Sequence, residues 1–336
     1  MPRPVLLPWP KSFGLHGQLL GLSNPKILKG VKAGFPYLTA ILHLAPHKRA
    51  GRDNVCTSAS KGCIAACLNL AGRGGVIPGG ATIRQNTVQV ARVRRTHLLF
   101  DAPATFESLL LAEVRKAVTY ARRYGTEIAG GGHQMSAVIR LNGTSDIRWE
   151  DVPMGGQANI FACFPQTQFY DYTKHVDRMA RRMPANYDLT FSISEENQRD
   201  AKRLLGRGVR CAGVFTELPD RFWNAPVIAG DDTDLRFLEP GGVIVGLTPK
   251  VGGRRQKQKL EEWRRGGFLL NPPEEDAENA EPPQRDYARS QVVFDPLRGG
   301  FHVGPTFVFD PDIIGGEYAS DEDTTPEDDV DDGFPD

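Results

Sequence analysis

Residues 37–70 read YLTAILHLAPHKRAGRDNVCTSASKGCIAACLNL, and this stretch decides the predicted fold. Its first part, Tyr37–Leu44, is apolar with β-branched residues and predicts a strand. A polar loop follows, and it leads into three cysteines that lie within twelve residues of one another. A short helix is expected from Ile64 to Leu70. The order of strand, loop and helix predicts that the chain opens as an α/β protein.

The three cysteines have the spacing CxxxxxxCxxxC, at Cys56, Cys63 and Cys67. Cys63 and Cys67 are four residues apart, so a helix that begins at Gly62 places both on one face. The Ser- and Gly-containing loop before the helix allows Cys56 to curl back toward them. We therefore expect the three thiols to form one metal or iron–sulfur site.

The type of metal follows from the number of thiolates. A [4Fe–4S] cluster held by three cysteines leaves one iron open to a substrate or cofactor. Zinc normally requires a fourth protein ligand, such as His47, His97 or Cys163, and none of these has a familiar zinc-site spacing. A third interpretation is that the cysteines are small buried residues that pack a helix. An iron–sulfur cluster is the leading prediction, and zinc is the alternative.

The chain beyond the cysteines alternates short apolar strands with helical segments. Strands that alternate with helices imply βαβ units, and therefore a parallel sheet with helices outside it. Six strands are too few for a closed eightfold barrel, so we predict a partial parallel β/α barrel or an open sheet. The later strands are expected at 137–141, 169–172, 188–192, 209–216 and 243–247, and helices at 81–99, 104–124, 156–164, 175–183, 195–206 and around 218–223.

Polar residues end these strands, and in a parallel sheet the carboxyl ends of the strands share one edge, where ligands collect. The cysteines follow the first strand and belong to the same edge. Any single residue of this kind can instead be a helix cap. The predicted catalytic residues are Asp146, Lys174 and Glu195, and the predicted cofactor-binding residues are Asn142, Ser145, Tyr172, Ser192, Ser194 and Glu217.

Charged residues are unevenly distributed along the chain of 336 residues, although it contains 41 Lys and Arg residues and 41 Asp and Glu residues. Residues 317–336 are strongly acidic, so the body before them carries a basic excess. We predict an N-terminal arm (1–34), an α/β core domain with the cysteine cluster (35–251), a charged linker (252–290), a hairpin (291–316) and a disordered acidic tail (317–336).

The sequence predicts a cytoplasmic protein. No stretch has the apolar length needed to cross a bilayer, and the first residues, MPRPVLLPWPKSFG, lack the apolar core of a signal peptide. Five cysteines, three of them clustered, fit a reducing compartment better than a disulfide framework. A basic stripe in the expected helix at 81–99 offers a possible contact with nucleic acid, although a solvated helix face explains it as well; the stripe consists of Arg84, Arg92, Arg94 and Arg95.

Six sequence blocks support a family resemblance. They are VCTSASKGCIAACLNLAGRGG, NTVQVARVRRTHLLF, VIRLNGTSDIRWE, FYDYTKH, YDLTFSISEEN and VIAGDDTDLRFLEPGGVIVGL. In this order they resemble the phage-encoded family known as gene product 88, whose members have no assigned activity. The resemblance covers about residues 35–250. It implies a phage protein that acts in the cytoplasm of the host cell.

A looser resemblance concerns architecture. A cysteine triad after the first strand of a partial parallel barrel is similar to the radical S-adenosylmethionine enzymes. The resemblance implies that Cys56, Cys63 and Cys67 hold a [4Fe–4S] cluster, whose open iron binds the amino and carboxylate groups of S-adenosylmethionine. It further implies that Ser192 or Glu217 contacts the ribose. The chain departs from the common CxxxCxxC spacing, and it lacks a clear Gly-Gly-Glu strand end.

Two functional hypotheses follow from these patterns. The first is an iron–sulfur enzyme of radical S-adenosylmethionine type, with a small-molecule, nucleotide or nucleic-acid substrate and no membrane partner. The second is a non-enzymatic nucleic-acid-binding protein with a structural zinc ion, in which the acidic tail competes for the basic stripe. A metal-free interaction protein is a third possibility.

Overall fold

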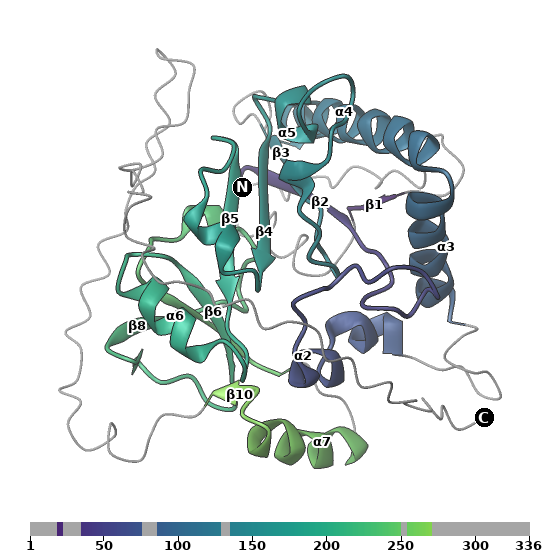
Figure 1. Cartoon of the computed structure of the whole chain (residues 1–336). Coiled ribbons are helices and arrows are strands. Elements are labelled where there is room, and N and C mark those ends of the chain that lie inside the picture. The colour runs from purple at the N-terminus through teal and green to yellow at the C-terminus, as the bar shows by residue number, and fades with distance from the viewer. Residues whose placement is uncertain (1–18, 23–34, 76–85, 129–134, 250–253, 271–336) are drawn as a thin grey trace, which may run out of the picture.

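A computed structural model of the chain describes residues 19–22, 35–75, 86–128, 135–249 and 254–270 (Figure 1). The described strands form one ten-stranded sheet in the order β1-β2-β3-β4-β5-β6-β9-β8-β7, with β10 paired to β6. The strands are β1 (Leu20–Gly21), β2 (Tyr37–Leu42), β3 (Ser136–Arg140), β4 (Gln168–Thr173), β5 (Tyr187–Ser192), β6 (Cys211–Phe215), β7 (Arg221–Phe222), β8 (Ala225–Ala229), β9 (Ile244–Leu247) and β10 (Leu269–Leu270).

The sheet is mostly parallel. The pairs that join β2 through β6 to β9 and β8 are all parallel, and so is the pair of β10 with β6. Only the end pairs, β1 with β2 and β7 with β8, are antiparallel among the described strands. The path of paired strands ends at β1 and at β7, so the sheet is open. The predicted α/β class with a parallel sheet is therefore confirmed, and the sheet is not a closed barrel.

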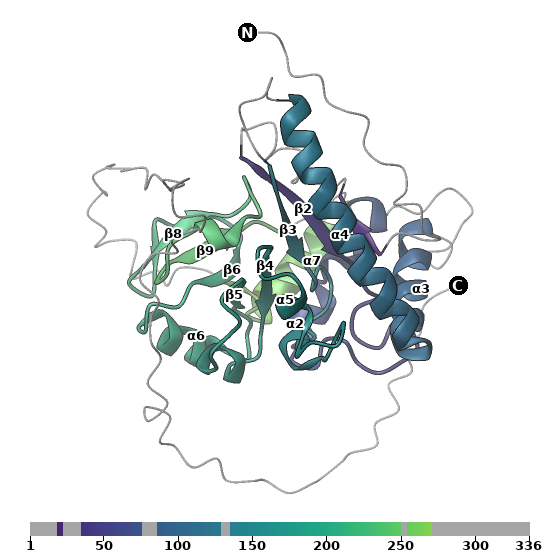
Figure 2. The same cartoon turned by 90° about the horizontal axis from the view of Figure 1, so that it is seen from above.

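Helices connect the strands and cover the sheet (Figure 2). The longest is α4, which begins at Pro103, a residue whose fixed φ suits the first turn of a helix. The α-helices of the described residues are α2 (Lys61–Ala65), α3 (Thr87–Asp101), α4 (Pro103–Ile128), α5 (Ile160–Cys163), α6 (Gln198–Leu205) and α7 (Arg254–Arg265). Short 3₁₀ turns occupy Leu68–Leu70, Gly72–Gly75, Trp149–Asp151, Asp177–Ala180 and Arg236–Leu238.

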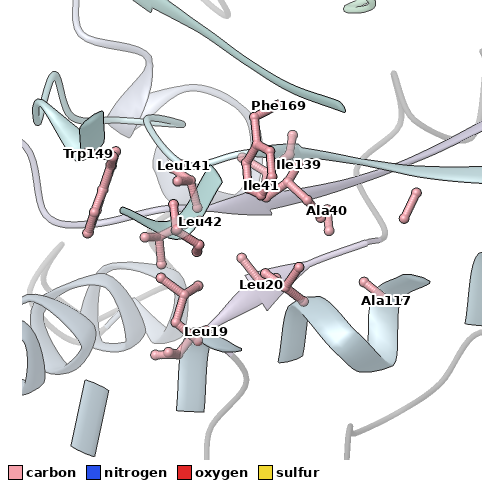
Figure 3. Close-up of a cluster of buried hydrophobic side chains, with 14 of the residues drawn as sticks. Leu19, Leu20, Ala40, Ile41, Leu42, Ala117, Ile139, Leu141, Trp149 and Phe169 are labelled. Carbon is pink, nitrogen blue, oxygen red and sulfur yellow. The ribbon is translucent and has the colours of Figure 1, made fainter. Parts of the chain in front are cut away.

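The main core lies where α4 packs against β1, β2 and β3. All six residues of β2 are buried, as expected for a parallel strand that is covered on both faces. Figure 3 shows Leu20 and Ala117 on one side of the strand that carries Ala40 and Ile41. Burying a leucine of this kind contributes roughly 1.5–3 kcal/mol relative to leaving it exposed. The core thus fixes β2 and the strand end from which the cysteine loop leaves.

Several predicted elements differ from those observed. The segment around 218–223, predicted as a helix, contains β7 and forms a hairpin with β8, which the sequence analysis did not predict. The helix predicted at 156–164 is only the short α5, and the one at 175–183 is a single 3₁₀ turn. The helix predicted at 64–70 begins earlier, at Lys61, and ends at Ala65. In each case tertiary packing overrides a local pattern of a few residues.

The domain boundaries also differ in part. Strand β1 lies within the predicted N-terminal arm and pairs with β2. Within the predicted linker at 252–290, α7 is followed by β10, which pairs with β6, so the sheet continues past residue 251. The predicted hairpin at 291–316 and the acidic tail at 317–336 lie outside the described residues. Among the described helices, none combines the length and apolar character that crossing a membrane requires.

Candidate functional site

The cysteine loop, which we define as residues 55–70, lies at the carboxyl edge of the parallel strands. In Figure 1, α2 lies beyond the arrowhead of β4, on the side to which the strand points. Ser60 is the N-cap of α2, and its hydroxyl accepts a hydrogen bond from the backbone N–H of Cys63 at 3.1 Å. The cap sets the start of the helix and therefore the position of Cys63.

Three consecutive strand ends hold this loop. After β3, the carbonyl of Thr144 accepts from the Cys56 thiol at 3.6 Å. After β4, the ring of His175 is hydrogen-bonded to the hydroxyl of Ser58, with Oγ 2.8 Å from Nδ1. After β5, Glu195 accepts from the backbone N–H of Gly62 at 2.6 Å, and also from the hydroxyl of Ser60. The loop therefore spans the edge at which the sequence analysis expected ligands to collect.

The three thiols influence one another. Burial, together with the nearby Cys67, Cys63 and Asp146, raises the pKa of Cys56 to about 12. Burial also raises the pKa of Cys67, against the opposing effect of Arg92. All three cysteines are half-buried. The thiols thus share one region of the loop, on the same sheet edge as Asp146.

The arrangement of the thiols differs from a formed metal centre. Among the residues that the structure describes, no group of three or more His, Cys, Asp or Glu side chains is placed to hold a metal ion. Three cysteines in one loop are the kind of donors that a thiolate-bound cluster uses, and Arg92 near Cys67 opposes the rise in the pKa of that thiol. Metal binding at this site would require the sulfur atoms to draw closer together.

Asp146, one of the predicted catalytic residues, is fully engaged. Its Oδ2 accepts from the backbone N–H of Lys174 at 2.8 Å, and its Oδ1 accepts from Arg178 at 2.9 Å. Arg178 is completely buried and also bridges to Glu150 through two hydrogen bonds of 2.8 Å. With these hydrogen bonds Asp146 acts as a positioning residue, because it orients the backbone of Lys174.

The other two predicted catalytic residues lie at the same edge. Lys174 donates from Nζ to the hydroxyl of Ser192 at 2.7 Å, so β4 and β5 place an amine and a hydroxyl side by side. Both side chains are half-buried and remain within reach of solvent. Glu195 binds α2 through both of its oxygens and acts as a clamp on the cysteine loop.

The predicted cofactor-binding residues divide into four groups. Asn142 and Ser145 bond to each other at 2.9 Å and close the turn after β3. Ser194 is buried, and its backbone N–H donates to Asn197 just before α6. Glu217 is exposed, two residues beyond β6. Tyr172 and Ser192, by contrast, lie beside charged side chains of the sheet.

A basic group that was not predicted from the sequence lies next to Tyr172. His43 follows β2, and Arg140 is the last residue of β3, where its guanidinium lies 4.7 Å from the centre of the Tyr172 ring. Arg140 donates to Asp234 at 2.7 Å. The signal in the sequence was the arginine that ends the apolar run SAVIR, since a charged residue in a covered strand is uncommon.

The basic stripe predicted in α3 is not continuous. Arg92 is buried and donates to the carbonyl and side chain of Asn69, both at 2.6 Å. Arg95 turns toward the carbonyl of His43 at 3.4 Å. Arg94 is exposed, while Arg84 lies outside the described residues. The stripe therefore offers less charge to nucleic acid than the sequence implied.

A glycine fixes how closely the cysteine loop approaches the sheet. A Cβ added at Gly62 would lie 2.7 Å from Cβ of Phe268 and 2.8 Å from both carboxylate oxygens of Glu195. We expect Gly62→Ala to lower the free energy of unfolding by about 1–3 kcal/mol, because the added methyl group has no room there. Urea unfolding measures the loss. Lys61→Ala, at an exposed position of the same helix, should leave the stability unchanged; equal losses in the two variants would contradict this account.

The pKa of His43 leads to a second prediction. Burial, together with the positive charges of Arg92 and Arg140, lowers this pKa to about 3. In the unfolded chain His43 takes up a proton near pH 6.5, whereas the folded protein resists it, so stability is lost as the pH falls from about 6.5 toward 3. We expect His43→Gln to lose less stability than wild type between these values, measured by urea unfolding across the range. Parallel curves for the two proteins would refute the prediction.

Comparison with known families and proteins gives one assignment. The family model described as gene product 88 matches residues 18–264, which is most of the chain. Comparisons with curated proteins and with solved structures gave no match. The matched range contains the cysteine loop and every strand of the sheet except β10. On this evidence the chain belongs to the gene product 88 family.

Proposed function

We propose that this protein is an iron–sulfur enzyme of the radical S-adenosylmethionine type that acts on a small-molecule or nucleotide substrate. The observation that carries the proposal is the placement of the three-cysteine loop over the carboxyl ends of β3, β4 and β5. Parallel α/β sheets bind their ligands at this edge. The run of parallel strands from β2 to β8 is also what a partial barrel requires.

The cysteines have a specific part in this proposal. Cys56, Cys63 and Cys67 would hold a [4Fe–4S] cluster, and three thiolates leave one iron open for the amino and carboxylate groups of S-adenosylmethionine. When bound, the cluster supplies the electron for reductive cleavage of that cofactor. Among the described residues no three possible ligands are placed to hold a metal ion, so cluster binding would require Cys56, Cys63 and Cys67 to draw closer together.

The chain's own residues support the site in two ways. Glu195 and His175 tie the cysteine loop to β5 and β4, which fixes its height above the sheet. Lys174 and Ser192 present an amine and a hydroxyl beside it, and these groups suit a carboxylate and a ribose. The hydrogen bonds that hold the cysteine loop and the one that joins Lys174 to Ser192 support this part of the proposal.

Anaerobic purification tests the proposal directly. Protein with bound iron and acid-labile sulfide that cleaves S-adenosylmethionine to methionine and 5′-deoxyadenosine under reduction would support it. Protein without iron and sulfide, even after reconstitution with both, would refute the cluster. Iron-containing protein that leaves S-adenosylmethionine intact would refute the chemistry. Zinc at one equivalent per chain would favour the structural-zinc alternative.

A further inference from the structure

The basic group at the ends of β2 and β3 lies beside the proposed active site. His43, which follows β2, is surrounded by Arg92 and Arg95 from α3 and Arg140 from β3, all of which act on its charge. The group borders the cysteine loop, because Arg92 also acts on Cys67 and binds Asn69 of that loop. Positive charge from two different elements thus converges on His43, and one of these arginines, Arg92, also lies near Cys67.

The hydrogen bonds of Arg92 and Arg140 do not use all of the donors of these two side chains. Arg92 is 8% exposed, and its hydrogen bonds run to the uncharged Asn69. Arg140 binds Asp234 through Nη1, while its Nε lies 4.0 Å from the nearest oxygen of Asp171. The Nε atoms of Arg92 and Arg140 are both buried, and neither has a hydrogen-bond partner among the described residues. Buried donors are almost always paired, so two such donors in one basic group indicate a place for an acceptor.

The guanidinium of Arg140 is also held in a defined orientation. It stacks over Tyr172, which restricts its motion, and its ion pair with Asp234 fixes one end of the fork. A guanidinium fixed in this way matches the paired oxygens of a phosphate or carboxylate. The side chains of His43, Arg140 and Tyr172 are all half-buried, so solvent reaches this face of the sheet.

We infer that His43, Arg92 and Arg140 bind an anionic group, a phosphate or a carboxylate, on the substrate of this protein. The inference rests on the proposed function in one respect, since it takes the adjoining cysteine loop as the reaction centre. The inference limits the substrate to molecules that carry a phosphate or a carboxylate at the end that lies nearest β2 and β3. Arg140 and Arg92 would contact the anion, with neutral His43 as a further hydrogen-bonding group.

The test is calorimetric titration of the full chain with two probes, inorganic phosphate and acetate, in separate experiments. We expect saturable binding of one probe, which identifies the anion. Arg140→Gln should weaken that binding by roughly tenfold to a hundredfold, as expected for the loss of hydrogen bonds to a charged group. Arg203→Gln is the matched control. Arg203 is an exposed, ion-paired arginine on α6, which lies far from α3 in Figures 1 and 2, and its replacement should leave binding unchanged.

Two further variants keep the test decisive. Arg140→Lys retains the positive charge but lacks the paired N–H donors of the guanidinium. It replaces Arg140→Gln in the titration if thermal melting shows that Arg140→Gln is unfolded. A chain with Cys56, Cys63 and Cys67 changed to serine separates the inference from the proposed function, because anion binding should persist in it while iron is lost. Absence of saturable binding with both probes would overturn the inference, and so would equal weakening by Arg140→Gln and Arg203→Gln.

Discussion

Changing Cys56, Cys63 and Cys67 together to serine is expected to reduce the iron and acid-labile sulfide of anaerobically prepared protein to background. The thiolate is the ligand that binds iron in such clusters, and a serine hydroxyl does not replace it at neutral pH. The absorbance of the cluster in the visible range should disappear as well. Cleavage of S-adenosylmethionine should fall to the rate found without protein.

The matched control for this variant is Cys163→Ser. Cys163 is also half-buried, but its thiol donates to the carbonyl of Met154 at 3.1 Å, outside the cysteine loop. We expect this variant to keep its iron and sulfide. Retention of iron by the triple variant, or an equal loss from Cys163→Ser, would show that the loop is not the metal site. Circular dichroism of each protein establishes that the fold persists.

Much of the fold could be predicted because parallel strands leave a strong signal. Apolar runs such as those of β2 and β5 are covered on both faces, and they lie within one or two residues of where the sequence placed them. The hairpin of β7 and β8 was missed because it contains few residues and departs from the βαβ alternation. The position of β9 between β6 and β8 depends on packing across the sheet, and no local sequence pattern encodes it.

The candidate site shows the same division between local and long-range information. The order of strand and loop predicted that Cys56, Cys63 and Cys67 lie at the carboxyl edge, and hydrogen bonds of Cys56, Ser58 and Gly62 place their loop there. That the three thiols form one metal site stays a prediction. The clamp between Glu195 and Gly62 joins residues 133 positions apart in sequence, so spacing could not reveal it. The group around His43 was missed for a similar reason, because its arginines come from a helix and a different strand.

Arg178→Met is expected to have the largest effect on stability. Arg178 is fully buried and holds the carboxylates of Asp146 and Glu150, which are themselves only 12% and 4% exposed. Removing the guanidinium leaves two buried negative charges without their partner. Breaking a buried ion pair in this way costs about 3–5 kcal/mol. Urea unfolding at neutral pH measures the loss.

A matched surface ion pair shows whether burial is the cause. Arg181 also binds a carboxylate through two nitrogens, that of Asp151, but both side chains are more than 40% exposed. Arg181→Met should therefore cost less than about 1 kcal/mol. Adding Glu150→Gln to Arg178→Met removes one of the stranded charges, so the double variant should regain part of the lost stability. Two outcomes would contradict this explanation: equal destabilisation by Arg178→Met and Arg181→Met, or a greater loss of stability when Glu150→Gln is added. In either case uncompensated buried charge would not be the source of the lost stability. The ion pairs of Arg178 with Asp146 and Glu150 would then contribute through packing instead.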